Sequence, residues 1–356
     1  MMESLYQISG ISRQGYHKSL LKSTKDQMMW QRMLEMIYEI RKDYPRISAR
    51  KIHYMLGINE VGINRFEQFV SKQGLTVQKH RSFLRTTHRG VNIYPNLTNG
   101  LRINGLNQLW VSDITYFLTS GTTFYLVFIL DVYSQRIIGH SASDNMFAVN
   151  NVLALLQALK LRGYSQYNKL IHHSDKGSQY GSKEYTKVLK DHSISISMAG
   201  NCLENPYAER INGIIKNDYM IKYKIRSLNE LKTSLNKAVA LYNHCPNGSL
   251  GMLNPIDFER AVEQNSAIEN PTLQLYDFST SDEENTKLGF VRNKSMRMYL
   301  NKNAVALITK TTAGYSPGSD YSLASCPPAE LASASSDHAK LSEQNQKMNL
   351  SYKQLK

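Results

Sequence analysis

The alternation of apolar and polar residues is most regular between residues 109 and 198, where it predicts a mixed α/β region. Three β-branched and aromatic runs come first, and the turns between them are short enough for antiparallel hairpins. An amphipathic helix, a strand, a second helix, a strand and a third helix then follow. The predicted strands are 109–118, 123–131, 136–141, 169–174 and 194–198, and the predicted helices are 148–161, 182–191 and one that begins at Pro206.

Three antiparallel strands followed by helix, strand, helix, strand and helix is the element order of a ribonuclease-H-like fold. We therefore predict a mixed five-stranded sheet with flanking helices over residues 105–260. A capping-box pattern at Ser227 and Glu230 opens one more helix, which runs to about Asn243. Its apolar positions are expected to pack against the core of this domain.

Residues 1–78 have a different pattern, which is polar, helical and rich in Lys and Arg. Two short helices are expected around Gly10, with Ser12 capping the second and Arg13 at its start. This is the layout of a helix-turn-helix, whose second helix can enter the major groove of DNA. It is equally the layout of an ordinary helical hairpin, so the pattern leaves both interpretations open.

Three further helices are predicted in this region, at about 27–42, from Ser48 onward, and over 62–75. Pro45 separates the first from the second. The last two again form a helix-turn-helix-like pair, whose candidate phosphate contacts are Arg50, Lys51 and Arg65. The alternative for these three side chains is an ordinary solvated face.

The remaining segments lack strong periodicity. Residues 79–104 are irregular and basic, and we interpret them as a linker that tracks a nucleic-acid backbone or serves as a hinge. Residues 261–310 form a C-terminal extension, with a small strand pair expected within 286–310. Ser, Ala, Pro and Gly dominate residues 311–356, which predicts a disordered low-complexity tail.

The composition adds a strong positive charge. The 43 Lys and Arg residues exceed the 29 Asp and Glu residues, which gives a formal charge of +14. Such an excess favours a polyanionic partner, because each neutralised phosphate releases condensed counterions. The three cysteines form neither a CxxC pair nor a disulfide framework. No signal peptide and no long apolar run is found, so we expect a cytoplasmic protein with no membrane partner.

Three acidic residues stand in different local contexts within the predicted core. Asp113 lies inside the first strand, Asp175 lies at the end of the fourth, and Glu209 lies in the helix after Pro206. These positions can converge in a mixed α/β domain, and converging carboxylates repel unless cations lie between them. Hard divalent ions accept carboxylate oxygens, and two such ions can polarise the attacking and leaving oxygens of a phosphoryl transfer. The pattern therefore predicts metal-dependent phosphoryl transfer.

Each of these acids belongs to a longer motif. The motifs are Trp110-Val-Ser-Asp-Ile-Thr-Tyr116, His173-Ser-Asp-Lys-Gly-Ser-Gln-Tyr180 and Glu204-Asn-Pro-Tyr-Ala-Glu-Arg-Ile-Asn-Gly-Ile-Ile-Lys216. Together they closely resemble the integrase core of bacterial insertion-sequence transposases, specifically the larger downstream reading frame of the IS-three family. The resemblance runs from about Leu5 to Phe258. Any one motif alone is weakly specific, whereas the three together are highly specific.

The resemblance implies an enzyme that cleaves DNA and joins strands through a DDE triad. Asp113, Asp175 and Glu209 match the catalytic acids of the family, which hold two Mg²⁺ or Mn²⁺ ions. Lys216 matches a basic residue that contacts DNA, and a spacing of seven places it on the same helix face as Glu209. The implied partners are the DNA of the element's ends and target, further copies of the chain in a homo-oligomer on DNA, and an upstream-frame protein joined by frameshift fusion. A nucleoid-associated location follows from the DNA partner.

Two departures from the family pattern keep a second interpretation open. The segment Tyr242-Asn-His-Cys-Pro-Asn-Gly-Ser-Leu250 has Cys245 and Asn247 where the family usually has Arg and His, and the tail at 311–356 has no family counterpart. The alternative is a catalytically decayed, DNA-binding remnant of a transposase. A ribonuclease H that cleaves RNA–DNA hybrids is a third interpretation, which the basic helical N-terminal region disfavours.

Other polar residues near the acids are interpreted as structural. Asp131 ends the second strand, where a turn former is expected. His172 and His173 precede Asp175, but no Cys or His has zinc-finger spacing to them. We therefore expect both histidines to pack or to form hydrogen bonds beside the sheet.

Overall fold

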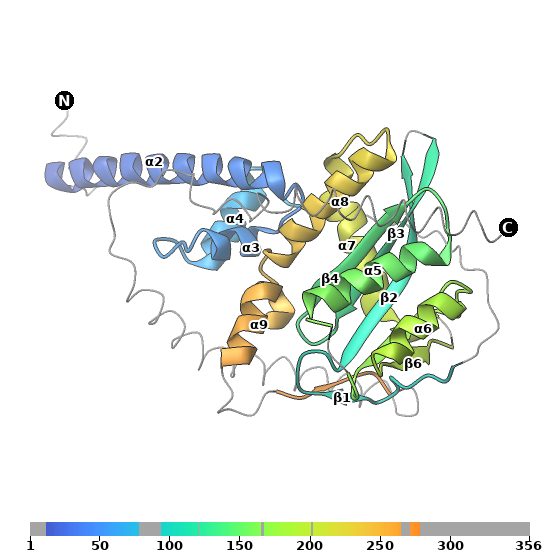
Figure 1. Cartoon of the computed structure of the whole chain (residues 1–356). Coiled ribbons are helices and arrows are strands. Elements are labelled where there is room, and N and C mark those ends of the chain that lie inside the picture. The colour runs from blue at the N-terminus through green and yellow to red at the C-terminus, as the bar shows by residue number, and fades with distance from the viewer. Residues whose placement is uncertain are drawn as a thin grey trace. The chain divides into compact units, whose positions relative to one another are not determined.

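A five-stranded sheet forms the centre of the chain in the computed structural model (Figure 1), which describes residues 12–77, 94–119, 121–164, 167–200, 202–264 and 271–277. The strands are β2 (Leu109–Thr119), β3 (Thr122–Asp131), β4 (Arg136–Ser143), β5 (Ile171–Ser174) and β6 (Ser195–Met198). Their order across the sheet is β4-β3-β2-β5-β6. The first three pair in antiparallel fashion, whereas β5 and β6 extend the sheet from β2 in parallel.

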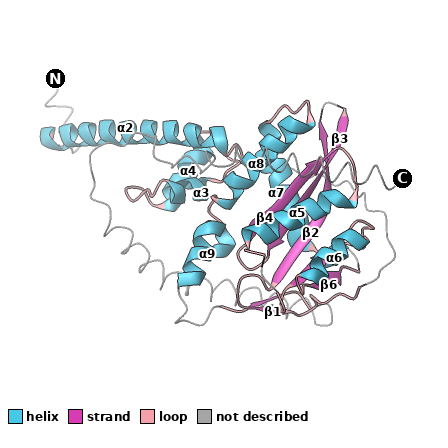
Figure 2. Cartoon of the chain, in the orientation of Figure 1, coloured by secondary structure: helices cyan, strands magenta, loops and turns pink. Residues whose placement is uncertain are grey.

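Helices cover both faces of this sheet (Figure 2). One face packs against α5 (Ala148–Leu161) and α6 (Lys183–Asp191), and the other against α7 (Pro206–Ile214) and α8 (Leu228–Asn243). Successive strand residues point to opposite faces, so Trp110 joins the first core and Val111 joins the second. The sheet therefore separates two hydrophobic cores.

The ribonuclease-H-like fold predicted from the element order is confirmed. Every predicted strand and helix between residues 109 and 198 is present, with ends that differ from the prediction by no more than two residues. The predicted cap of α8 is also present, because the Ser227 hydroxyl accepts a hydrogen bond from the Glu230 backbone N–H. Strong apolar periodicity and clear turn residues make these elements readable from the sequence.

The N-terminal region is helical, but one predicted break is wrong. Helix α2 (Arg13–Asp43) is a single element of 31 residues, so the short helix expected after Ser12 and the helix expected at 27–42 are one. No proline occurs within this range to interrupt it. Ser12 caps the helix as predicted, since its hydroxyl accepts from the Gly15 backbone N–H at 3.0 Å. The helix expected around Gly10 lies outside the described residues.

Two shorter helices complete the N-terminal region, as predicted. They are α3 (Ala49–Met55) and α4 (Ile63–Lys72). Ile52 of α3 and Phe66 of α4 are fully buried in the same hydrophobic cluster as Ile37 of α2. This cluster is continuous with the core on the α7 and α8 side of the sheet, which attaches the helical region to the catalytic domain.

Three elements beyond the predicted set lie at the ends of the core. They are α9 (Pro255–Gln264) and the two-residue strands β1 (Arg102–Ile103) and β7 (Leu273–Gln274), which pair with each other. The described end of the expected linker, residues 94–104, lies against the core. For example, the Leu97 N–H donates to the Ser197 hydroxyl at 2.9 Å. This end of the segment is part of the catalytic domain's packing.

Single-turn helices complete the described elements. They are the 3-10 helices Cys202–Glu204, Met220–Lys222 and Gly248–Leu250, and the π-helical turn Ile215–Tyr219 that continues α7. Most of the linker (79–93), the strand pair expected within 286–310 and the tail at 311–356 lie outside the described residues. Among the helices that the structure describes, none has the length and apolar character of a membrane span.

Candidate active site

Strand pairing brings two of the three candidate acids to neighbouring strands at the same level. β2 and β5 run in parallel with Ser112 opposite Ser174, and Asp113 and Asp175 are the residues that follow. Parallel neighbours keep a constant register, so the two acids occupy equivalent positions. Asp113 is near the centre of the long strand β2, whereas Asp175 lies just beyond the end of β5.

Helix α7 carries the third acid to the same place. The side chain of Asn205, the cap residue of α7, is buried and donates from Nδ2 to the carbonyl oxygen of Ser112 at 3.0 Å. Pro206 occupies the first helical position, where its missing N–H costs nothing. The bond fixes the start of the helix beside Asp113, so that Glu209 in the first turn approaches the two aspartates.

The electrostatics of the site show that Asp113 is affected by both other carboxylates. Burial, the charge of Asp175 and the charge of Glu209 together raise the pKa of Asp113 to about 8. Burial also raises the pKa of Asp175 and of Glu209. In the part of the chain that the structure describes, none of the three forms an ion pair. The site is therefore a cluster of acids that favours an external cation.

Asp175 is held by the turn that follows it. The Gly177 N–H donates to Asp175 Oδ1 at 3.1 Å and lowers the pKa of this carboxyl against the larger effect of burial. A side chain at position 177 would place its Cβ 3.0 Å from that same oxygen. The glycine thus permits a close approach of the backbone that orients the carboxylate.

Two polar residues one and two turns after Glu209 complete the inner face of α7. Asn212 donates from Nδ2 to Asp113 Oδ2 at 2.8 Å. Lys216 donates from Nζ to Thr115 Oγ1 at 2.6 Å, and it lies close enough to Asp113 for that charge to raise its pKa against the lowering effect of burial. The structure therefore places Lys216 beside the acids as expected, with its amine held by β2.

Asn205 and Asn212 were not identified from the sequence. Their only signal was their spacing from Glu209, since residues 205, 209, 212 and 216 follow one face of a helix. That spacing alone does not tell a hydrogen-bonded asparagine from any polar helix residue. Contact with Asp113 and Ser112 depends on the docking of α7 against β2.

The two histidines before Asp175 are structural, as predicted. His172 is fully buried and forms a hydrogen bond with the Tyr185 hydroxyl at 2.9 Å, and burial lowers its pKa to about 3. His173 contacts Ser197 Oγ at 2.8 Å and the carbonyl oxygen of Glu204 at 3.2 Å, and burial lowers its pKa to about 4. Both rings are therefore neutral at pH 7 and belong to the sheet core.

The candidate DNA contacts in the N-terminal region lie apart from the acids. Arg13 is exposed at the start of α2. Arg50 forms two hydrogen bonds with Glu67, both at 3.1 Å. The Arg65 guanidinium lies over the ring of Trp30, and Lys51 Nζ lies 3.7 Å from Cys245 Sγ. The structure thus keeps these four side chains on the helical region, and three of them already have partners within the chain.

The donor set at the acids suits hard divalent ions. Carboxylate oxygens are the usual protein ligands of Mg²⁺, which commonly takes one or two of them and completes its shell with water and substrate phosphates. No group of three or more Asp, Glu, His or Cys side chains within the described residues is arranged to hold one ion by itself. Two ions that share the three acids, each with one or two protein carboxylates, do not require such a cage.

Comparison with known families agrees with this geometry. Two family models, both described as integrase core domain, match residues 104–201 and 190–255. These ranges together include all three acids. The catalytic core of HTLV-2 integrase in complex with magnesium is 22% identical and covers 46% of this chain and 99% of its own, with a TM-score of 0.35. A TM-score this low is not evidence of a shared fold. The integrase-core assignment therefore rests on the sequence matches.

Relatives extend the match beyond the core. The "Insertion element IS600 uncharacterized 31 kDa protein" of Shigella sonnei is 29% identical over 73% of this chain and 99% of its own length. The "Putative transposase InsK for insertion sequence element IS150" of Escherichia coli is 30% identical over 64% of this chain and 81% of its own length. The transposase InsF of insertion sequence IS3A, also from Escherichia coli, is 35% identical over 39% of this chain and 49% of its own length. The chain therefore belongs to the insertion-sequence transposases of the IS-three family and is a DNA transposase of the DDE polynucleotidyl-transferase class.

Proposed function

We propose that Asp113, Asp175 and Glu209 are the catalytic acids of this transposase, and that they serve the cleavage of DNA at the element's ends and its joining to target DNA. The observation that carries the proposal is the convergence of three acids, from β2, β5 and α7, in a partly buried place. Such a cluster is unfavourable by itself, because the charges of Asp175 and Glu209 act on the half-buried Asp113. Divalent cations remove that cost and turn the cluster into a phosphoryl-transfer site.

The cofactor in this proposal is a pair of Mg²⁺ or Mn²⁺ ions. Asp113 and Asp175 would hold or bridge the ions, and Glu209 would complete the second site. When bound, the ions polarise the attacking and leaving oxygens of the phosphodiester and lower the pKa of the attacking hydroxyl. The nucleophile is water in the cleavage step and the freed 3′-hydroxyl of the element's end in the joining step.

The neighbouring side chains have positioning roles in this proposal. The amide of Asn212 holds one oxygen of Asp113 and leaves the other for a metal ion. The Gly177 N–H does the same for Asp175. Lys216 is a cation beside the acids, and we propose that it exchanges its bond to Thr115 for a phosphate oxygen when DNA enters the site. Each role follows from a hydrogen bond that the free protein forms and needs no large rearrangement.

The proposal extends to the wider DNA contacts. Arg13, Arg50, Lys51 and Arg65 would contact phosphates of the element's ends. Exposed ion pairs such as Arg50 with Glu67 contribute at most about 1 kcal/mol to stability. Exchange of the carboxylate for a DNA phosphate therefore costs little free energy. The active assembly would be a homo-oligomer on DNA at the bacterial nucleoid, joined by an upstream-frame protein through frameshift fusion.

The test uses labelled DNA that carries the element's own ends, with Mg²⁺ or Mn²⁺, and three proteins. These are the wild type, Asp175→Asn and the control Asp191→Asn, whose carboxylate is exposed at the end of α6. We expect metal-dependent cleavage or joining by the wild type and the control, and its loss in Asp175→Asn. Equal activity of all three proteins would overturn the assignment of the acids.

A catalytically decayed DNA binder is the alternative that this experiment also addresses. If the wild type is inert, the assay is repeated with the upstream frame fused to the chain. Inertness in that form, with binding to the element's ends retained, would replace the enzyme by a DNA-binding remnant. The altered residues Cys245 and Asn247 are the observation that favours this alternative.

A further inference from the structure

A cavity of about 220 Å³ lies on the side of α7 that faces away from the acids. Tyr207, Arg210 and Ile214 line it from α7, and their spacing of three and four residues places them on one helix face. Asn212 and Lys216, which contact β2, lie on the opposite face. The remaining walls come from α3 and the segment before it, from the β3–β4 turn, from the π-helical turn, and from the end of α8 and the residues after it. One helix therefore separates the acids from the cavity.

The cavity is positively charged. Its lining includes Arg46, Lys51 and Arg210 but only one acid, Asp218. Arg46 Nε lies 3.3 Å from Asp218 Oδ1, so this pair is largely neutral. Within the described residues, neither Lys51 nor Arg210 forms an ion pair. The partner of Lys51 is the thiol of Cys245, which is a weak acceptor, and Asp218 is the one acid among three cations in the lining, so the cavity favours an anionic ligand.

The cavity is also aromatic. Tyr44, Tyr207, Tyr219 and Tyr242 all contribute to its lining. Tyr219 makes edge-to-face contacts with Tyr44 and with Tyr242, with both pairs of ring centroids 6.2 Å apart. Cations together with aromatic side chains are the combination that single-stranded nucleic-acid sites use, because the cations follow the phosphates and every base offers a face for stacking.

We propose that this cavity receives one unpaired nucleotide of the DNA strand that the acids act on. The base would lie among the tyrosines, and its phosphate would contact Lys51 and Arg210. The inference rests on the proposed function, because it requires a DNA strand at the acids. Arg210 directly follows Glu209 and is exposed, so a strand that leaves the acids meets this side chain as it passes around α7.

The site itself provides the probe for the first test. Cys245 lines the cavity and is buried, and it can be followed alone after Cys202→Ser and Cys326→Ser. A small thiol reagent is applied to this full-length chain with four probes: a short single-stranded oligonucleotide, its fully abasic equivalent, the same sequence as a duplex, and a free deoxynucleoside monophosphate.

We expect the single-stranded oligonucleotide to slow the modification of Cys245 by about tenfold, within the range expected for the stacking of one base. The abasic strand carries the same charge and is expected to protect far less. Equal protection by the abasic strand would overturn the proposal, since the phosphates alone would then explain it. Protection by the free monophosphate but not by the oligonucleotide would also overturn it, because the ligand would be a small molecule.

A second measurement does not depend on the reactivity of the thiol. The affinity for the single-stranded oligonucleotide is compared between Lys51→Gln and Lys187→Gln, a control of equal charge change on the exposed face of α6. A third variant, Ser48→Trp, fills the rim of the cavity without any change of charge. We expect about tenfold weaker binding for Lys51→Gln and for Ser48→Trp, and less than about twofold for Lys187→Gln. Wild-type affinity in Ser48→Trp would contradict the proposal.

The two ways to fail are distinguishable. If the proposed function is wrong, no metal-dependent cleavage that is sensitive to Asp175→Asn occurs in any form of the chain. If only the cavity assignment is wrong, that cleavage is present, while Cys245 stays unprotected and Ser48→Trp binds the oligonucleotide like the wild type.

Discussion

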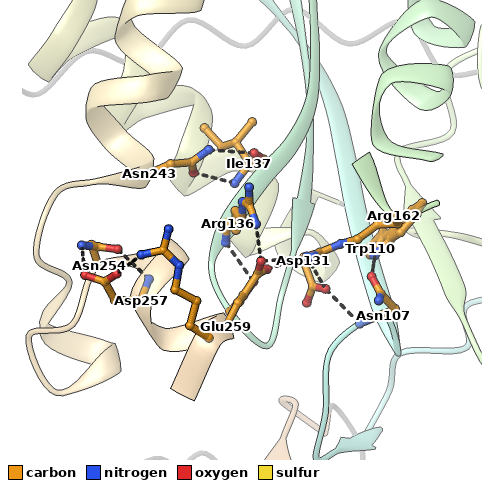
Figure 3. Close-up of polar contacts among 12 residues, drawn as sticks. Asn107, Trp110, Asp131, Arg136, Ile137, Arg162, Asn243, Asn254, Asp257 and Glu259 are labelled. Atoms are coloured by element: carbon orange, nitrogen blue, oxygen red, sulfur yellow. Dashed lines mark hydrogen bonds and ion pairs between the residues drawn. The ribbon is translucent and has the colours of Figure 1, made fainter. Parts of the chain in front are cut away.

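The molecule contains two groups of acids at one sheet, and they have opposite surroundings. Asp131 and Glu259 are buried, whereas Asp113 and Asp175 are half-buried and Glu209 is exposed. Asp113, Asp175 and Glu209 form no ion pair within the described residues. In the second group, Asp131 at the end of β3 and Glu259 in α9 lie among the guanidinium groups of Arg136 and Arg162 (Figure 3). Acidic side chains thus serve two purposes. Where arginines form ion pairs with the acids, the acids connect elements of the fold, and where no ion pair forms, the acids are available for ions from outside.

The ion-paired group of Asp131 and Glu259 connects separate elements of the fold. Arg162 Nη2 lies 2.5 Å from Glu259 Oε1 and 3.3 Å from Asp131 Oδ2, and the Ser134 hydroxyl donates to Glu259 at 2.7 Å. Burial acts to raise the pKa of Glu259, but the hydrogen bonds and charges of the two arginines outweigh it and the pKa is lowered. Burial raises the pKa of Asp131 to about 6 in spite of Arg162. The group fastens α9 to the β3–β4 turn and to the end of α5.

The largest expected effect concerns Asp113. Asp113→Asn is expected to reduce strand cleavage by about a thousandfold or more, because it removes a metal ligand from a two-metal site. The same change is expected to raise the free energy of unfolding without metal by about 1 kcal/mol or more at pH 8, because it removes a buried, repelling charge. Cleavage rates and thermal unfolding at pH 8 measure the two effects. A loss of both activity and stability would show that Asp113 is a structural residue.

The corresponding change in the ion-paired group, Glu259→Gln, is expected to lower stability and to leave cleavage nearly unchanged. Glu259→Gln leaves the Arg162 and Arg136 guanidinium groups without their main partner, which for a buried pair costs about 3–5 kcal/mol of stability. Cleavage per folded molecule is expected to remain within about twofold, because the metal ligands are untouched. Denaturant unfolding, together with cleavage measured at a temperature where the variant is folded, tests this. An unchanged free energy of unfolding would contradict the role of Glu259 in connecting α9 to the rest of the fold.

The pH dependence distinguishes the two groups further. The pKa of Asp113 is raised to about 8 from an ordinary value near 4, so the folded, metal-free protein binds more protons than the unfolded chain between these values. Its contribution to stability therefore falls as the pH rises through this window. Metal affinity changes in the other direction, since the ligand must lose its proton. At limiting Mn²⁺, cleavage is expected to rise by about fiftyfold between pH 6 and pH 8, as the ionised fraction of Asp113 does, and a flat profile would contradict the raised pKa.

A smaller effect is expected at Asn212. Asn212→Ala removes the hydrogen bond that holds Asp113 Oδ2 but no metal ligand, so we expect about a tenfold loss of cleavage. The loss should appear mainly as a weaker affinity for Mn²⁺. The cleavage rate at saturating Mn²⁺ should come within about threefold of the wild-type rate. Asn217→Ala, in the π-helical turn beyond Lys216, is a control on the same helical stretch. An equal loss in both variants would point to general damage to this stretch.

The sequence predicted the catalytic domain well because its elements are strongly periodic. Strand β2 is a β-branched and aromatic run that begins at its predicted residue, Leu109, and α5 was placed at its observed bounds, Ala148–Leu161. The three acids were proposed because each stands in a distinct motif: Asp113 inside a strand, Asp175 at a strand end and Glu209 in the first turn of a helix. In all these cases the prediction depends on residues that are close together in the sequence, and the fold then brings the predicted elements into contact.

The missed features depend on contacts between distant residues. The spacing places Asn212 and Lys216 on the same helix face as Glu209. Only the docking of α7 on β2 shows that Asn212 contacts an acid. Helix α9 was missed, although Phe258 and Val262 are buried one turn apart. The ion pair of Arg162 and Glu259 joins residues 97 positions apart, which no local pattern reveals.

The central claim is that the unpaired acids, and not the paired ones, are completed by divalent ions. Titration calorimetry with Mn²⁺ at pH 8 tests this most directly, on the wild type, Asp113→Asn, Glu259→Gln and the surface control Asp191→Asn. We predict Mn²⁺ binding by the wild type, by Asp191→Asn and by folded Glu259→Gln, and its loss or a drop of about a hundredfold in Asp113→Asn. Undiminished Mn²⁺ binding by Asp113→Asn would contradict the account.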